Sequence, residues 1–374
     1  MKASFQAIFE PFALPCGVRL KNRISMAPMT ISAANSDGSV SEDDLHYYSR
    51  RARRVGMVIT ASTTISAQGG FPGSGAIDRD EMIPGLSRLA STIKEHGAKA
   101  VLQIVHGGRQ CPPSNGDVVS ASAVPMEKEG AVVPRELQGD EIVDIVHAFG
   151  EATRRAIEAG FDGVEIHGAN GFLIQQFFSP HSNRREDRWG GTLEKRMTFP
   201  LAVVDKVHRI VRQYAKEPFI VGYRLSPEEA ETPGITMAET LPFVEALAAK
   251  PLDYLHISLN DFWSVPRRGI DDNRPRIQII QERIGHLVPV MGVGAIRTAQ
   301  DAARALQTGV PLIALGRELI MEPDWIEKIA EGREDEIKTS ISRGDQNRLA
   351  IPDSLWRMIS GVPGWFPIDQ GNPD

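Results

Sequence analysis

The chain has little cysteine, no long apolar run and no excess of basic residues, and each scarcity excludes a class of protein. Its 374 residues contain two cysteines, Cys16 and Cys111, too few for a disulfide framework or an iron–sulfur cluster. No stretch approaches the roughly 20 apolar residues that span a bilayer, so we expect no membrane partner. A net charge of −6 argues against a nucleic-acid partner, which a basic face would attract.

We expect no secretory signal at the N-terminus. Its one lysine, Lys2, is not followed by a continuous apolar segment, because Gln6, Glu10 and Pro11 interrupt the sequence. Scarce cysteine fits a reducing compartment. We therefore expect a cytoplasmic protein.

Short β-rich runs alternate with longer amphipathic segments along the chain. We expect strands at 23–27, 57–61, 100–105, 163–167, 219–225, 254–258, 289–292 and 311–315. We expect helices at 42–54, 84–96, 139–159, 193–214, 237–249, 275–284, 299–307 and 323–331. Eight strand–helix units predict an α/β fold, a closed TIM (β/α)8 barrel. An open doubly wound sheet is the alternative, but the first turn lacks its glycine-rich signature.

Two segments lie outside this repeat in a chain that we interpret as one domain, 1–374, with its barrel at about 22–335. Residues 106–138, after the third strand, hold several prolines and predict a lid or irregular hairpin over the barrel mouth. The C-terminal tail, 336–374, carries Trp356, Trp365 and Phe366. Such apolar side chains suggest docking, and a second subunit is one surface that could receive them, so a homo-oligomer stays open.

The most informative polar pair follows the fourth expected strand, where His167 is followed three residues later by Asn170. In this fold, active-site groups come from the carboxyl ends of the strands. An imidazole and a carboxamide can together hold one carbonyl oxygen and stabilise the negative charge that develops on it. The alternative is a buried histidine beside a turn residue.

Glycines end the last two expected strands, in Gly292-Val293-Gly294 and Gly316-Arg317. Loops at this position often bind phosphate, and an arginine adds a charge-assisted hydrogen bond. FMN, PLP or a sugar phosphate would satisfy such a site. No lysine ends a strand, which disfavours a Schiff base, and His167 and Asn170 offer only one good metal ligand, so no metal is expected.

Other strand ends carry groups suited to the polar edge of a flavin. Gln103 offers an amide donor and acceptor, Arg224 a permanent charge and Thr30 a hydroxyl. Taken singly, Gln103 could be a core-edge amide and Arg224 part of a barrel-mouth ion pair. Their joint occurrence on separate strands favours the flavin.

Five motifs together resemble the old yellow enzyme family, the FMN-dependent ene-reductases: FEPFALPCGVRLKNRISMAPMT, AVLQIVHGGRQ, FDGVEIHGANGFLIQQFFSPHSNRREDRWGGTLEKR, VGYRLSP and IALGREL. The resemblance covers nearly the whole chain. It implies a TIM barrel with an N-terminal hairpin plug and non-covalent FMN. It also implies hydride transfer from NAD(P)H to flavin N5 and then to the β-carbon of an α,β-unsaturated carbonyl, with nitro compounds and quinones as further substrates.

The resemblance also implies roles for individual residues. Contacts to the isoalloxazine would come from Ala27, Pro28, Met29 and Thr30, and contacts to its polar edges from Ala61, Gln103 and Arg224. The phosphate would lie against Gly292, Gly294, Gly316 and Arg317. A small electrophilic alkene would bind through its carbonyl oxygen to His167 and Asn170, beside Phe172.

Two positions depart from the family pattern. Phe172 stands where many members have a tyrosine proposed to protonate the α-carbon, and Ser32 stands where some have another tyrosine. The proton donor is therefore unassigned, with water the simplest candidate. A flavin-binding protein without efficient turnover and a non-redox barrel are the alternatives. The physiological substrate and the choice between NADH and NADPH stay open.

Overall fold

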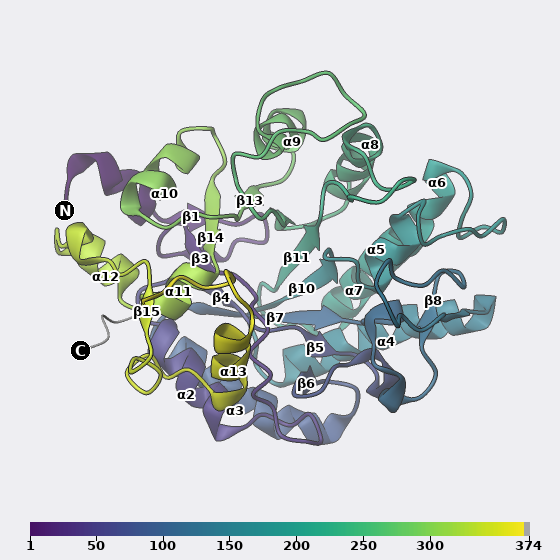
Figure 1. The fold of residues 1–374 in the computed structure, drawn as a ribbon, viewed down its shortest axis with the longest axis horizontal. Helices are drawn as coiled ribbons and strands as arrows, with labels where there is room; N and C mark the ends of the chain where they lie inside the picture. The colour runs from purple at the N-terminus through teal and green to yellow at the C-terminus, as the bar shows by residue number, and fades with distance from the viewer. Residues whose placement is uncertain (370–374) are drawn as a thin grey trace.

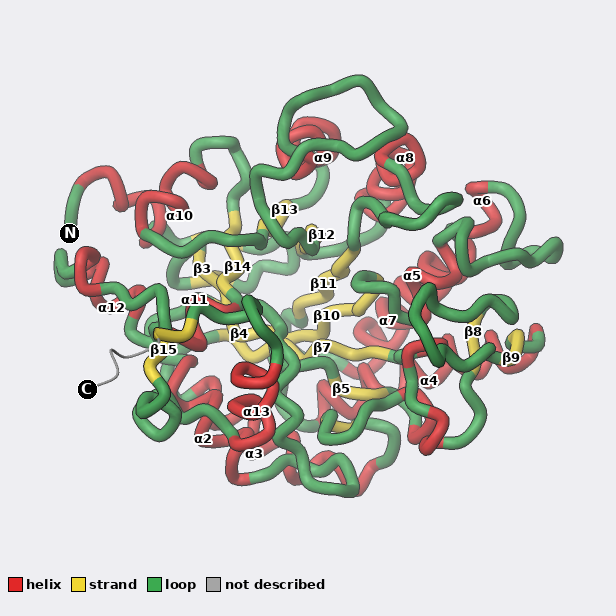
Figure 2. The backbone as a smooth tube through the Cα atoms, viewed as in Figure 1, coloured by secondary structure: helices red, strands yellow, loops and turns green. Residues whose placement is uncertain are grey.

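Eight parallel strands close into a barrel in the computed structural model, which describes residues 1–369. Neighbouring strands follow one another along the chain, and the last pairs with the first. The strands are β3 (Ile24–Met26), β4 (Met57–Ile59), β7 (Lys99–Val105), β10 (Gly163–Gly168), β11 (Ile220–Leu225), β12 (Tyr254–Ile257), β13 (Val290–Gly292) and β14 (Leu312–Leu315). Figure 1 shows the helices around them, and Figure 2 shows the strands at the centre. The predicted TIM barrel is confirmed.

The main helices lie where the amphipathic segments predicted them: α2 (Glu42–Arg51), α3 (Ile83–Lys94), α4 (Gly139–Glu158), α7 (Thr198–Tyr214), α8 (Met237–Ala248), α9 (Arg276–Ile284), α10 (Ala299–Leu306) and α12 (Trp325–Ala330). Ser41 begins α2 with a capping box to Asp44. The single helix expected at 193–214 is wrong, because α6 (Leu193–Arg196) precedes α7 as a separate turn. Pro200 has no N–H to donate and therefore suits the first turn of a new helix.

The barrel interior is apolar at one end. Side chains alternate along each strand, so Val164 and Ile166 pack against the helices while Met57, Ile220 and Leu312 point inward. A short hairpin closes this end: β1 (Phe12–Ala13) and β2 (Arg19–Leu20) pair antiparallel and bury Leu14, Val18 and Leu20 in the interior cluster. The polar strand ends consequently all lie at the opposite mouth.

Several short elements lie around that mouth and were not predicted. They include β5 (Thr63–Thr64), β6 (Gly75–Ala76), α5 (Leu173–Phe178) and α11 (Arg317–Met321). The remaining short elements are α1 (Gln6–Phe9) and 3-10 turns at Ala3–Phe5, Ala67–Gly69, Asp80–Met82, Gly108–Gln110, Pro113–Asn115 and Glu334–Glu336.

The insertion at 106–138 is no hairpin. Its strands β8 (Val119–Ser120) and β9 (Arg135–Glu136) pair parallel, because the chain between them crosses back before the second strand. Arg185 fastens the segment by donating to the carbonyl oxygens of Ala121, at 3.0 Å, and Leu137, at 2.7 Å.

The tail packs on the barrel of its own chain. It forms β15 (Ile341–Ser342), α13 (Asp353–Gly361) and β16 (Ile368–Asp369), and it buries Leu349, Ile351, Leu355, Ile359 and Phe366 in the helix-layer core. The fully buried Arg51 donates to the carbonyl oxygens of Leu349, at 2.6 Å, and Ile320, at 3.3 Å. Docking of the tail needs no second subunit. Residues 370–374 lie outside the described part of the chain, within which no helix is long and apolar enough to cross a membrane.

Candidate functional site

A cavity of about 560 Å³ opens at the carboxyl ends of the strands. Its lining includes most of the residues that the sequence nominated from different strands: Ala27, Pro28, Met29, Thr30, Asn170, Arg224, Gly294, Gly316 and Arg317. We call it the main cavity. Its volume lies within the range of about 300–1,000 Å³ that is usual for small-molecule sites. Gln103 and His167 are buried at the strand ends beneath the mouth.

The imidazole of His167 is held neutral with its proton on Nε2. The amide N–H of Ala169 donates to Nδ1 at 3.3 Å, so this nitrogen acts as an acceptor and Nε2 carries the hydrogen. Burial, together with the positive charge of Arg224, keeps the pKa of His167 well below 6.5. The ring is therefore a neutral hydrogen-bond donor at physiological pH.

Asn170 lines the main cavity. The residue has a left-handed backbone with φ of 57°, which asparagine tolerates better than most side chains. Its Oδ1 accepts hydrogen bonds from Ser258 Oγ, at 2.9 Å, and Ser226 Oγ, at 3.4 Å. These two hydroxyls hold the carboxamide in place. Nδ2 has no acceptor among the described residues and is available to a ligand.

A buried polar cluster lies below this pair. Gln103 Nε2 donates to Glu165 Oε1 at 2.7 Å, and His256 Nδ1 lies 2.9 Å from Glu165 Oε2. Although burial opposes ionisation, His256 and Arg224 keep the pKa of Glu165 below its usual value. The carboxylate therefore offsets the charge of Arg224, whose buried Nε has no partner among the described residues. A bound ligand is the natural acceptor for this arginine.

Glu165 and His256 were missed by sequence reasoning. A signal was present, since each is a polar residue inside an apolar strand. Glu165 lies two positions before His167 and so shares its inward face.

The far end of the main cavity is cationic, and two of its lining residues, Gly294 and Gly316, are glycines. Gly294 has φ of 136°, and a Cβ there would lie 2.7 Å from the amide nitrogen of Phe262. A Cβ at Gly316 would lie 3.0 Å from Met29 Sδ. Arg317 lines this end together with Arg297, which the sequence analysis did not nominate.

Gly292 does not line the main cavity. As the last residue of β13 it faces the helix layer, where a Cβ would meet Phe262 and Ile277. The alternation of side chains along the strand explains this placement. Among the nominated glycines, Gly294 and Gly316 are brought together at the cationic end.

Glu318 is an unexpected acid at the same end. Its side chain is buried, and neither carboxylate oxygen has a hydrogen-bond partner among the described residues. Burial and the neighbouring Glu322 raise the pKa of Glu318 to about 8. At neutral pH the group is therefore mostly protonated and can donate a hydrogen bond to an anion.

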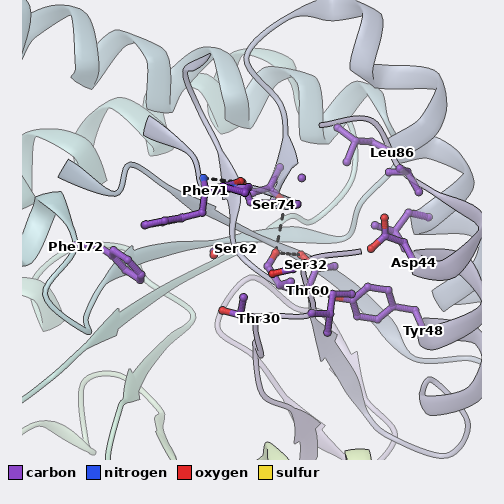
Figure 3. A pocket seen from close by; sticks show the side chains of 18 of the residues that line it. Thr30, Ser32, Asp44, Tyr48, Thr60, Ser62, Phe71, Ser74, Leu86 and Phe172 are labelled. Carbon is purple, nitrogen blue, oxygen red and sulfur yellow. Dashed lines mark hydrogen bonds between the residues drawn. The ribbon is translucent and has the colours of Figure 1, made fainter. Parts of the chain in front are cut away.

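A second cavity of about 260 Å³ adjoins the mouth, and we call it the side cavity (Figure 3). Thr30, Ala61 and Phe172 line it. The amide N–H of Ala61 donates to the hydroxyl of Tyr48 at 2.6 Å, and its carbonyl accepts from Thr60 Oγ1 at 3.1 Å. Ala61 was expected at the polar edge of the flavin, and its backbone N–H is here bonded to Tyr48, which was not predicted.

The residues at the mouth fit FMN. Two arginines and two glycine backbones suit a phosphate, and the unpartnered guanidinium of Arg224 suits the polar edge of a flavin ring. The neutral donors on His167 and Asn170 suit a carbonyl oxygen.

Comparison with known proteins agrees with this geometry. The sequence model of the NADH:flavin oxidoreductase / NADH oxidase family matches residues 7–336. A probable NADH-dependent flavin oxidoreductase of Bacillus subtilis, YqiG, is 51% identical over 98% of this chain and 99% of its own length. The NADH:fumarate oxidoreductase of Klebsiella pneumoniae is 45% identical over 95% of this chain, which spans 39% of that longer protein. The old yellow enzyme homologue of Zymomonas mobilis superposes with a TM-score of 0.75 at 27% identity, over 87% of this chain and 93% of that one.

Proposed function

Because the chain belongs to the NADH:flavin oxidoreductase / NADH oxidase family, the old yellow enzymes, we propose that it reduces activated alkenes conjugated to a carbonyl group. It is an oxidoreductase that holds FMN non-covalently and uses NADH or NADPH as co-substrate. The relatives named for NADH-dependent reduction of fumarate and of acrylate act on such alkenes, which supports the assignment.

In this proposal FMN fills the main cavity. Gly294, Arg297, Gly316 and Arg317 would hold its phosphate, and Ala27, Pro28, Met29, Thr30 and Arg224 would hold its ring. When bound, FMN would supply hydride transfer through N5 between NAD(P)H and the β-carbon of the alkene. The permanent charge of Arg224 favours the anionic reduced ring, and Glu165 keeps that arginine from being a lone buried charge.

His167 and Asn170 are the proposed catalytic residues. The Nε2–H of His167 and the Nδ2–H of Asn170 donate to the carbonyl oxygen of the substrate. Negative charge grows on this oxygen as hydride reaches the β-carbon, so both hydrogen bonds strengthen toward the transition state. Because His167 is neutral, it donates without transferring its proton.

The α-carbon receives its proton from water in this proposal. Phe172 packs edge-on against His167, with ring centroids 4.8 Å apart, and therefore sits beside the bound carbonyl without a proton to give. Substrates such as nitroalkenes and quinones are also within this chemistry, since their oxygens can bind the same donors. Homo-oligomer formation is not required by any step.

The observation that carries the proposal is the pair of neutral donors beside an unpartnered buried arginine. Anaerobic stopped-flow measurements test it: NAD(P)H should bleach the flavin band, and an enone should restore it. A protein that is reduced by NAD(P)H but not reoxidised by any enone, enal or nitroalkene would refute alkene reduction while leaving the family assignment intact.

A further inference from the structure

The side cavity is joined to the proposed substrate position. Thr30 lines both the main and the side cavity. Phe172 lies between His167 and Phe71, with ring centroids 4.8 Å and 5.5 Å away. A substrate whose carbonyl is bound at His167 and Asn170 therefore has this cavity as its neighbour.

The cavity is elongated and mostly apolar. Figure 3 shows Phe172 and Phe71 at one end and Leu86, Asp44 and Tyr48 at the other. The small side chains of Ser32 and Ser62 lie between the two ends and leave the space open.

Its wall is preformed. The two loops that build it are joined by backbone hydrogen bonds, from Ala34 N–H to Gly73 O at 3.2 Å and from Ala76 N–H to Gly38 O at 2.9 Å. A Cβ at Gly73 would lie 2.6 Å from the carbonyl oxygen of Ser32, which shows how closely the loops approach. Such a wall needs little reordering when a ligand enters.

The two polar groups at the inner end already have partners. Asp44 Oδ2 accepts from the amide of Ser41 at 3.0 Å, and the hydroxyl of Tyr48 accepts from Ala61. Burial raises the pKa of Asp44, so a second acid would be unwelcome beside it. The inner end therefore favours a neutral group over a carboxylate.

We propose that the side cavity binds a neutral apolar substituent, aryl or alkyl, carried by the β-carbon of the alkene. This inference rests on the proposed function, because it takes the carbonyl to be held by His167 and Asn170. An apolar cavity of about 150 Å³ is large enough for benzene, so 260 Å³ accommodates a phenyl ring with carbons to spare. The protein should therefore prefer β-substituted enones and enals to dicarboxylates of the fumarate type.

Two methyl ketones that differ only at the β-carbon test the proposal: 3-buten-2-one and 4-phenyl-3-buten-2-one. Val40 lines the cavity and is partly exposed, so Val40→Phe fills space there, and the melting temperature checks the core that Val40 also contacts. We expect it to lower kcat/KM for the phenyl ketone by about tenfold or more and to change that for 3-buten-2-one by less than about twofold. Val265→Phe, at an exposed position outside the cavity, is the matched control.

Ser62→Leu narrows the middle of the cavity and should give the same selective loss, which guards against a folding defect in one variant. FMN content and the melting temperature check each fold. Equal losses for both ketones, or no loss for the phenyl ketone, would overturn the inference.

Binding supplies a readout independent of turnover. The saturated ketone 4-phenylbutan-2-one should perturb the flavin spectrum of the oxidised holoenzyme, with a Kd raised about tenfold or more in Val40→Phe. If the wild type reduces neither alkene, the proposed function fails. An unchanged Kd in both variants would instead refute the cavity assignment alone.

Discussion

The backbone amide of Ala169 donates to Nδ1 of His167, so the neighbouring residue sets which imidazole nitrogen carries the proton. The proposed donor is thus set by one backbone amide rather than by an acidic side chain. An aspartate in that place would pull the ring toward its charged form, whereas an amide keeps it neutral.

Replacing either donor should slow alkene reduction selectively. We expect His167→Ala and Asn170→Ala each to slow the oxidative half-reaction by about 10²–10³ and flavin reduction far less, because the developing oxyanion exists only in the former. Stopped-flow separation of the two half-reactions is the measurement. Equal losses in both would mean that the pair holds the flavin or the fold.

The low pKa of His167 predicts a flat pH profile for carbonyl ligands. A histidine whose pKa is lowered well below 6.5 stays neutral from about pH 6 upward. Ligand affinity should therefore show no inflection near pH 6.5 in a spectral titration of the oxidised holoenzyme. An inflection there that disappears in His167→Gln would show that the ring ionises in the normal range.

Glu318 should make the affinity for FMN fall as the pH rises above neutrality. Its pKa is raised to about 8, so the acid is mostly neutral at pH 7 and becomes an anion beside the proposed phosphate site as pH rises. If only the protonated form binds, affinity for FMN at pH 9 is about tenfold weaker than at pH 7. Titration of apoprotein with FMN measures this, and Glu318→Gln should abolish the fall. A Gln variant with the wild-type pH profile would place the effect elsewhere.

Arg317→Ala should lower FMN occupancy, since it removes a permanent charge from the end proposed for the phosphate. Chromatography of flavin released from the purified variant gives the occupancy. Arg348→Ala, at an exposed tail position, is the control and should retain full FMN. Full occupancy in Arg317→Ala would mean that the phosphate lies at another strand end.

A tyrosine at position 172 should act as a general acid. Phe172→Tyr is expected to speed oxidation of the reduced enzyme by weakly activated alkenes, because well-placed general acids contribute about 10²–10⁴. The gain should be smaller for nitroalkenes, whose product can leave before protonation. If proton transfer from water limits the native reaction, enone reduction shows a solvent isotope effect. An inert variant without such an effect would identify another side chain as the donor.

The barrel could be predicted from the sequence because each strand repeats one local pattern. Each of the eight expected ranges overlaps a barrel strand, and helices with recognisable ends, such as the Ser41 capping box, lie between them. The break between α6 and α7 escaped prediction, since both segments are amphipathic and only the position of Pro200 separates them. The parallel pair in the insertion was missed because four strand residues carry no usable periodicity.

The site was predictable wherever a residue follows a strand. Asn170, Arg224 and Arg317 line the main cavity as expected, because the carboxyl end of every strand opens on one mouth. Gly292 faces the helix layer because successive residues of a strand point to opposite sides. A glycine has no side chain whose polarity could indicate this side in the sequence. Tyr48, Arg297 and Glu318 come from helices and loops, so only the tertiary structure brings them to the mouth.

The hydrogen bond from Arg317 Nη1 to the carbonyl oxygen of Trp365, at 2.8 Å, connects the barrel to the docked tail. Trp365 also lines the main cavity. Arg317, which follows the last strand, therefore contacts both the cavity and the tail. Thermodynamic linkage is reciprocal. If the docked tail strengthens cofactor binding by some free energy, cofactor binding stabilises the docked tail by the same free energy. Loss of FMN would then loosen the tail around Trp365, and limited proteolysis within this segment would distinguish empty from loaded molecules before either had unfolded.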